Sequence, residues 1–225
     1  AALALFAFAF VAPHAPSAWP LAAGLIAFAC VSAEVLVASA YAPRLPPRAL
    51  FFALIPLGAM VGVALAGAAV SELAASMIVT LALLVLGTLT GGVVGNAIEE
   101  PGYLIVVAAV SALVDVFSVL HPGGPTAQLV QIEVATNVLI LPWPILGTAR
   151  IEPVLGVGDV AFAAIYAVAT KRHALPMART LGALAVGLVV TLVVVVATGV
   201  GVPALTFLGA AVVIAKPAAR AVPRK

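Results

Sequence analysis

The sequence predicts an all-α fold, a bundle of helices that crosses a membrane several times. Of its 225 residues, 65% are hydrophobic and 8% are charged, whereas soluble domains carry about 25% charged residues. Apolar runs of about 20 residues, long enough to cross a hydrocarbon core of about 30 Å as helices, make up most of the chain. Proline, glycine and charged residues separate these runs.

Eight apolar segments are predicted as helices. The first is interpreted as the end of a truncated transmembrane helix, because no basic region precedes it as in a signal peptide, so one helix or more is expected to be missing. The segments are Ala1–Val11, Ala18–Tyr41, Leu50–Val70, Leu73–Asn96, Gly102–Leu120, Leu155–Thr170, Leu181–Val200 and Pro203–Ala215.

The third and fourth segments are predicted to form an antiparallel hairpin, since only Ser71 and Glu72 separate them. Both segments repeat small residues at every fourth position, and such faces let helix backbones approach closely in lipid. These residues are Gly58, Gly62 and Ala66 in one segment and Gly87, Gly91 and Gly95 in the other. Helix packing is the preferred explanation of both faces.

The stretch 121–153 does not fit a regular membrane-crossing helix. It contains HPGGP, the acidic Glu133, and two prolines, Pro142 and Pro144, that remove amide donors. We expect a long structured loop with an interfacial helix and a short extended run. That run consists of Val138, Leu139, Ile140 and Leu141.

Lysine and arginine are distributed unevenly between the two sides of the predicted bundle. Nine of the ten lie on one side and only Arg150 on the other. Because cytoplasmic loops are enriched in these residues, the C-terminus is predicted to be cytoplasmic and the loop 121–153 to face outward. The cell (inner) membrane is the expected location. The net charge of +2, scattered near segment ends, argues against nucleic-acid binding.

The only two aspartates of the chain are predicted to lie at similar depths in consecutive segments. Asp115 lies five residues before the outer end of its segment, about 7.5 Å, and Asp159 lies four residues into the next, about 6 Å. Two carboxyl groups in contact share a proton and titrate as a pair. Ser111 and Ser118 share the helix face of Asp115, which forms a stripe suited to holding water. Spacing alone leaves open a protease dyad, a transporter ion site and a structural pair.

Two short motifs accompany the aspartates. Residues 156–159 read GxGD, and together with Ala161 they also fit the dinucleotide fingerprint GxGxxG/A, which here lacks the required strand, βαβ unit and later acidic residue. The tripeptide formed by Pro203, Ala204 and Leu205 carries little information alone, since a proline commonly opens a helix. Their order is more specific: LVDVFSVLHPGGP, then LGVGDVAF, one intervening helix, and PAL at the start of the last.

This combination, over residues 102–215, resembles the presenilin and signal peptide peptidase family of intramembrane aspartic proteases. The resemblance implies a bundle of nine helices in the full chain. It also implies that Asp115 and Asp159 are the catalytic pair and that no metal or organic cofactor takes part. Gly156 and Gly158 would allow close packing by the second aspartate, and the PAL tripeptide would border the active site and shape substrate binding.

The resemblance also implies an activity and a division of the chain. Residues 1–101 would form N-terminal transmembrane helices, and residues 102–225, with the loop 121–153, the catalytic transmembrane region. Substrates would be transmembrane segments of membrane proteins or signal peptides, paired as a strand beside the run 138–141. The outward loop is similar to signal peptide peptidases, which favours signal-peptide and type II anchors. The family usually has a tyrosine before the first aspartate, where Val114 stands here.

Two alternatives from the sequence remain open. A prepilin-peptidase-like protease also uses GxGD, but its aspartates are expected near the cytoplasmic face and it lacks a PAL counterpart. A non-catalytic membrane binding protein or transporter would keep the same scaffold. The side of the membrane on which the loop 121–153 lies, and the tolerance of either aspartate to asparagine, distinguish these readings. The sequence makes no prediction of oligomeric state.

Overall fold

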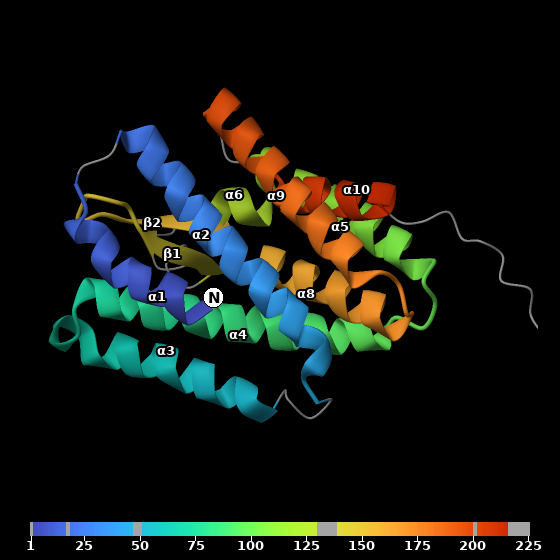
Figure 1. Cartoon of the computed structure of the whole chain (residues 1–225), viewed down its shortest axis with the longest axis horizontal. Coiled ribbons are helices and arrows are strands. Elements are labelled where there is room, and N and C mark those ends of the chain that lie inside the picture. Colours follow the sequence, from blue (N-terminus) through green and yellow to red (C-terminus); the bar gives the residue numbers. More distant parts are fainter. Residues whose placement is uncertain (1, 17–18, 47–50, 130–138, 200–201, 216–225) are drawn as a thin grey trace, which may run out of the picture.

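The computed structural model describes residues 2–16, 19–46, 51–129, 139–199 and 202–215, and this part of the chain is mostly helical (Figure 1). The all-α prediction is therefore confirmed. Most predicted helices appear within a few residues of their expected bounds. The α-helices of the described residues are α1 (Ala2–Val11), α2 (Pro20–Tyr41), α3 (Leu54–Ala66), α4 (Glu72–Ala97), α5 (Tyr103–Leu120), α6 (Pro125–Leu129), α8 (Val157–Arg172), α9 (Met177–Thr198) and α10 (Ala204–Ala215), of which α6 had no predicted bounds.

Four helices of the described chain are long and apolar enough to cross a membrane. They comprise Pro20–Arg44, Glu72–Ala97, Tyr103–Leu120 and Met177–Thr198. Shorter apolar helices cover Leu3–His14, Phe51–Ala66 and Ala204–Ala215. Helix length and composition therefore indicate a membrane protein, with fewer full-length spans than the eight segments predicted from the sequence.

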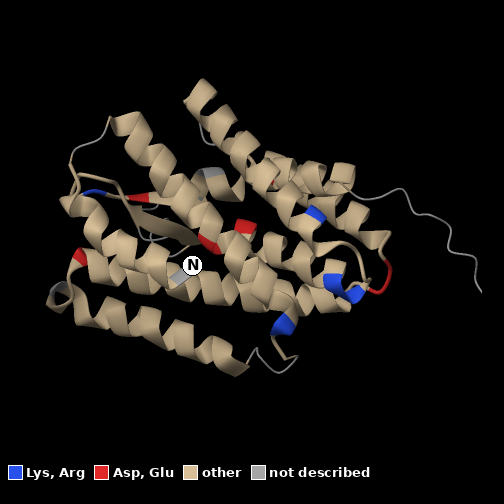
Figure 2. Ribbon diagram, in the orientation of Figure 1, with Lys and Arg blue, Asp and Glu red and all other residues tan. Residues whose placement is uncertain are grey.

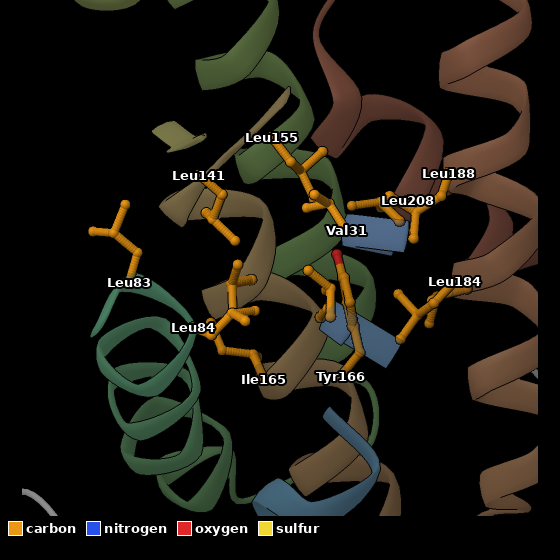
Figure 3. Close-up of a cluster of buried hydrophobic side chains, with 14 of the residues drawn as sticks. Val31, Leu83, Leu84, Leu141, Leu155, Ile165, Tyr166, Leu184, Leu188 and Leu208 are labelled. Atoms are coloured by element: carbon orange, nitrogen blue, oxygen red, sulfur yellow. The ribbon is translucent and has the colours of Figure 1, made fainter. Parts of the chain in front are cut away.

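The helix α8 lies at the centre of the bundle and packs most extensively against α4. All residues from Ala163 to Thr170 are buried, as expected for a helix surrounded by other helices on every side. Its neighbours contribute Val31, Leu184 and Leu208 to the same apolar cluster (Figure 3). The helix that carries the second aspartate is thus the most enclosed element of the fold.

The small-residue face of α4 is what lets α8 approach. A Cβ atom at Gly87 would lie 2.8 Å from the Val160 Cβ, and one at Gly95 would lie 2.9 Å from the Ile165 carbonyl oxygen. By contrast, a Cβ at Gly58 or Gly62 in α3 would meet nothing within 4 Å. The close contact predicted from the small residues therefore exists, but α4 makes it with α8, whereas the face on α3 stays open.

A two-stranded antiparallel sheet precedes α8. Strand β1 (Ile140–Pro144) pairs with β2 (Ile151–Gly156), with Ile140 opposite Gly156. The Thr80 hydroxyl of α4 donates a hydrogen bond to the Pro142 carbonyl at 2.6 Å, and Trp143 is completely buried. The sheet is thereby held against the helices.

The structure corrects three bounds predicted from the sequence. The extended run begins at Ile140, since Leu139 is helical, and it reaches Pro144, beyond the predicted end at Leu141. Leu155 belongs to β2, so that α8 begins at Val157. Prolines are tolerated here because both strands of a two-stranded sheet are edge strands, whose outward amides need no partner. Val138, the first residue of the predicted run, lies outside the described residues. The short helix α6 lies in the same loop.

One buried carboxyl group has no hydrogen-bond partner in the described part of the chain. Glu34, near the middle of α2, is 2% exposed, and neither carboxyl oxygen has a hydrogen-bond partner there. We expect Glu34→Leu to stabilise the protein by about 1–3 kcal/mol, because it removes an unsatisfied buried group. Thermal unfolding in detergent measures the change. The control Glu72→Leu, in the exposed first turn of α4, is expected to give no gain, and a lower melting temperature for Glu34→Leu would contradict the prediction.

Candidate active site

Asp115 binds the beginning of α10. It lies in the last turns of α5, is partly exposed, and its Oδ2 accepts a hydrogen bond from the backbone N–H of Leu205 at 2.9 Å. The first backbone N–H groups of a helix have no acceptor within the helix. They form the positive end of the helix dipole, which attracts a carboxylate. The Thr206 hydroxyl donates to the Ala112 carbonyl at 3.4 Å, which adds a second link between the two helices. Residues 90 positions apart are thus joined at the first aspartate.

Asp159 lies in the first turn of α8 and binds back to the residue before that helix. Its Oδ2 accepts a hydrogen bond from the Gly156 N–H at 3.1 Å, and Gly156 is the extended residue that immediately precedes α8. An acidic side chain at the third helical position commonly reaches back in this way to the residue before the helix. GxGD here is therefore a turn from strand β2 into α8 that fixes one oxygen of the aspartate.

The two aspartates come together at the junction of α5, α8 and α10. The charge of Asp115 acts on Asp159, so the two carboxyl groups lie within electrostatic range of each other. Both side chains are partly exposed, which leaves them accessible to small molecules. In each carboxyl group one oxygen is held by a backbone amide. This arrangement keeps both groups in place while an oxygen of each stays available for chemistry.

The other predicted site residues differ in how far they are buried. Pro203 and Ala204 are buried at the start of α10, and Leu205 is half-buried beside Asp115. In the predicted extended run, Leu139 is exposed, Ile140 is half-buried opposite Gly156, and Leu141 is fully buried. The run is thus connected through Gly156 to the second aspartate.

The two glycines of GxGD are not needed for close packing in this structure, since a side chain at either position would meet few atoms. A Cβ at Gly156 would make an ordinary contact of 3.4 Å with Asp159 Oδ2, and one at Gly158 would have nothing within 4 Å. The backbone amide of Gly156, rather than the space it leaves, is what contacts the aspartate.

The two serines beside Asp115 have different roles. The Ser118 hydroxyl is 2.7 Å from the Thr126 hydroxyl and accepts from the Thr126 N–H at 3.0 Å, so it joins the end of α5 to α6. Ser111 is buried and donates to the Ala108 carbonyl at 3.1 Å. Ser118 is thus bonded to α6, and of the two serines predicted to hold water only Ser111 remains a candidate. Tyr166 of α8 lies next to Ser111, which the spacing in the sequence did not reveal.

No family model, curated protein or solved structure matches this chain. The interpretation of the site therefore depends on its own residues and geometry. Within the described ranges, three or more histidine, cysteine, aspartate or glutamate side chains do not gather anywhere in a way that could hold a metal ion. The acid pair is the chemistry that the site offers.

The basic residues mark one end of the bundle (Figure 2). Lys171 and Arg172 end α8, Arg179 lies in the first turn of α9, and Arg44 ends a short turn that packs on α8. Arg150 lies in the hairpin turn between β1 and β2, before the opposite end of α8. The aspartates are close to the hairpin end, away from the basic one.

Proposed function

We propose that this protein is an intramembrane aspartic endopeptidase, which hydrolyses peptide bonds in transmembrane segments of other proteins. The observation that carries the proposal is the hydrogen bond from the Leu205 amide to Asp115. It brings the PAL tripeptide to the first aspartate, while the GxGD turn brings the second aspartate to the same place. Three sequence features that are far apart in the chain thus meet at one acid pair.

The mechanism follows from a proton shared between two carboxyl groups. The ionised carboxylate takes a proton from water as the water oxygen attacks the peptide carbonyl carbon, and the protonated partner donates its proton to the carbonyl oxygen. A proton then passes to the peptide nitrogen, the C–N bond breaks, and a new carboxyl and a new amine leave. The backbone amides of Leu205 and Gly156 keep the two carboxyl groups oriented throughout.

A reconstituted cleavage assay tests the proposal directly. Purified protein in detergent or liposomes is incubated with a labelled transmembrane peptide, with and without a transition-state analogue of aspartic proteases, and products are identified by mass spectrometry. We expect cleavage within the apolar segment and its loss with the analogue. Analogue-insensitive cleavage, or none with a panel of transmembrane peptides, would contradict the proposal and favour a binding protein or transporter.

The positive-inside pattern predicts which substrate orientation is used. An active site made of L-residues accepts a peptide backbone in one N-to-C direction, so the orientation of the enzyme determines that of its substrates. With the basic end of the bundle in the cytoplasm, we expect preference for segments whose N-terminus is cytoplasmic, as in signal peptides and type II anchors. Matched type I and type II substrates in sealed vesicles measure this preference.

Cysteine labelling tests the premise of that prediction. In a Cys30→Ala background, Thr126→Cys in α6 is expected to react with an impermeant maleimide from outside the cell, and Arg172→Cys at the end of α8 only after permeabilisation. Reaction of Thr126→Cys from the cytoplasmic side alone would reverse the predicted orientation. Equal cleavage of type I and type II segments would contradict the preference even if the orientation is right.

A further inference from the structure

Tyr166 of α8 places a hydroxyl group in the apolar core, among Val31, Leu184 and Leu208 (Figure 3). The residue is 1% exposed, and its hydroxyl oxygen has no hydrogen-bond partner in the described residues. Leaving a buried hydroxyl unsatisfied is costly, and phenylalanine would fill the same space without that cost. A tyrosine at this position is explained if its hydroxyl binds something that a phenyl ring cannot.

Polar atoms of α5 lie near this hydroxyl. The Ser111 hydroxyl lies beside it, close to hydrogen-bonding distance, and itself donates to the Ala108 carbonyl. A Cβ atom at Gly209 of α10 would lie 3.3 Å from the Tyr166 hydroxyl oxygen and 3.3 Å from the Ala108 carbonyl oxygen. The missing side chain of Gly209 therefore keeps a methyl group away from two polar atoms. Three helices contribute to a small polar spot in an otherwise apolar region.

This polar spot lies beneath the acid pair. Ser111 is one turn before Asp115 on the same face of α5, a rise of about 6 Å. Tyr166 is two turns after Asp159 on the same face of α8, and a helical side chain leans back toward the start of its helix. Each of the two helices therefore has an aspartate above and a hydroxyl below, and the Tyr166 hydroxyl faces the same α10 that binds Asp115.

We propose that Tyr166 and Ser111 hold a water molecule beneath the two aspartates, and that Tyr166 is a positioning residue for the water that the acid pair uses. A water beside these hydroxyls gives the Tyr166 hydroxyl the partner that it lacks and donates to the Ser111 oxygen, and buried waters typically make about three hydrogen bonds to such groups. The catalytic part of this inference rests on the proposed function. Hydrolysis consumes one water for each peptide bond, and a held water one turn from Asp115 provides it inside the bilayer.

Hydroxyl-radical footprinting by brief X-ray irradiation of the full chain in detergent tests the water site without reference to proteolysis. Radicals formed from a bound water oxidise the side chain beside it, so we expect Tyr166 to be modified despite its burial. Trp143, which is equally buried and packs edge-on against Phe6, is the dry control and is expected to remain unmodified. Absence of modification at Tyr166 overturns the water site whether or not the protein cleaves peptides.

Two substitutions test which residues hold the water. Ser111→Ala removes one partner, and Gly209→Ala places a methyl group beside the Tyr166 hydroxyl, so both are expected to cause loss of Tyr166 modification. Gly182→Ala in α9 is the matched control, since its Cβ would meet nothing within 4 Å, and it is expected to leave the modification unchanged. Unchanged modification in both Ser111→Ala and Gly209→Ala would overturn the assignment of these partners.

Cleavage kinetics test the positioning role. We expect Tyr166→Phe to lower kcat about tenfold, the effect of one ordinary hydrogen bond, with KM unchanged and the melting temperature equal or higher. Tyr103→Phe, at a 49% exposed position, is expected to change neither. An unchanged kcat in Tyr166→Phe overturns the positioning role. Failure of the wild-type protein to cleave would instead contradict the proposed function, while the footprint still decides the water site.

Discussion

Asp115→Asn and Asp159→Asn are each expected to reduce cleavage at least about a thousand-fold, because either change removes a carboxyl group from the proton transfers. Members of one catalytic unit act non-additively, so the double mutant is expected to be no worse than either single mutant. The rate of cleavage of a labelled transmembrane peptide by purified variants measures these effects.

The structure provides a reason to expect both variants to fold. Each aspartate accepts a backbone N–H, from Leu205 or from Gly156, and an asparagine carbonyl oxygen can accept the same bond. The matched control is Glu152→Gln, the same change at an exposed acid in β2, which is expected to keep full activity. Retained cleavage in either aspartate variant, with a normal melting temperature, would exclude the acid pair as the catalytic centre.

Gly91→Ala is expected to destabilise the protein by about 1–3 kcal/mol, because the added methyl group overpacks the contact between α4 and α8. A Cβ at this position would collide with the Ala161 carbonyl and lie 2.7 Å from the Ala164 Cβ. Both atoms belong to the helix that carries Asp159, so relieving the collision displaces the second aspartate. A displacement of about 1 Å at a catalytic group costs about a hundred-fold in rate, and we expect a loss of that size in cleavage.

The neighbouring glycine is the control for this prediction. A Cβ at Gly92 would meet nothing within 4 Å, and alanine is preferred over glycine inside a helix by about 1 kcal/mol. Gly92→Ala is therefore expected to keep activity and to match or exceed the wild-type melting temperature. The melting temperature and the cleavage rate of Gly91→Ala and Gly92→Ala test this prediction. Equal behaviour of the two variants would show that the approach of α8 to α4 does not determine the position of Asp159.

Local sequence was sufficient for the helices and for the candidate acids. Whether an apolar run forms a helix in lipid depends on its own length and composition, so most bounds were predicted within a few residues. The two aspartates stood out because ionisable groups are rare in such runs. The division at 101 and 102 and the protease activity remain predictions.

The tertiary structure decided which surfaces meet. Small residues marked a close-packing face on α4, but its partner proved to be α8, since a glycine face fits whichever helix presents matching shape. The start of α8 at Val157 depends on strand pairing with β1, and β1 is in turn held by Thr80, 62 residues away from Pro142. Tyr166 gave no sequence signal because its relation to Ser111 exists only when α5, α8 and α10 pack together. Chain composition determined which segments are apolar enough to cross a membrane as helices, whereas complementary side-chain shape and backbone hydrogen bonds between distant residues determined how the aspartates come together.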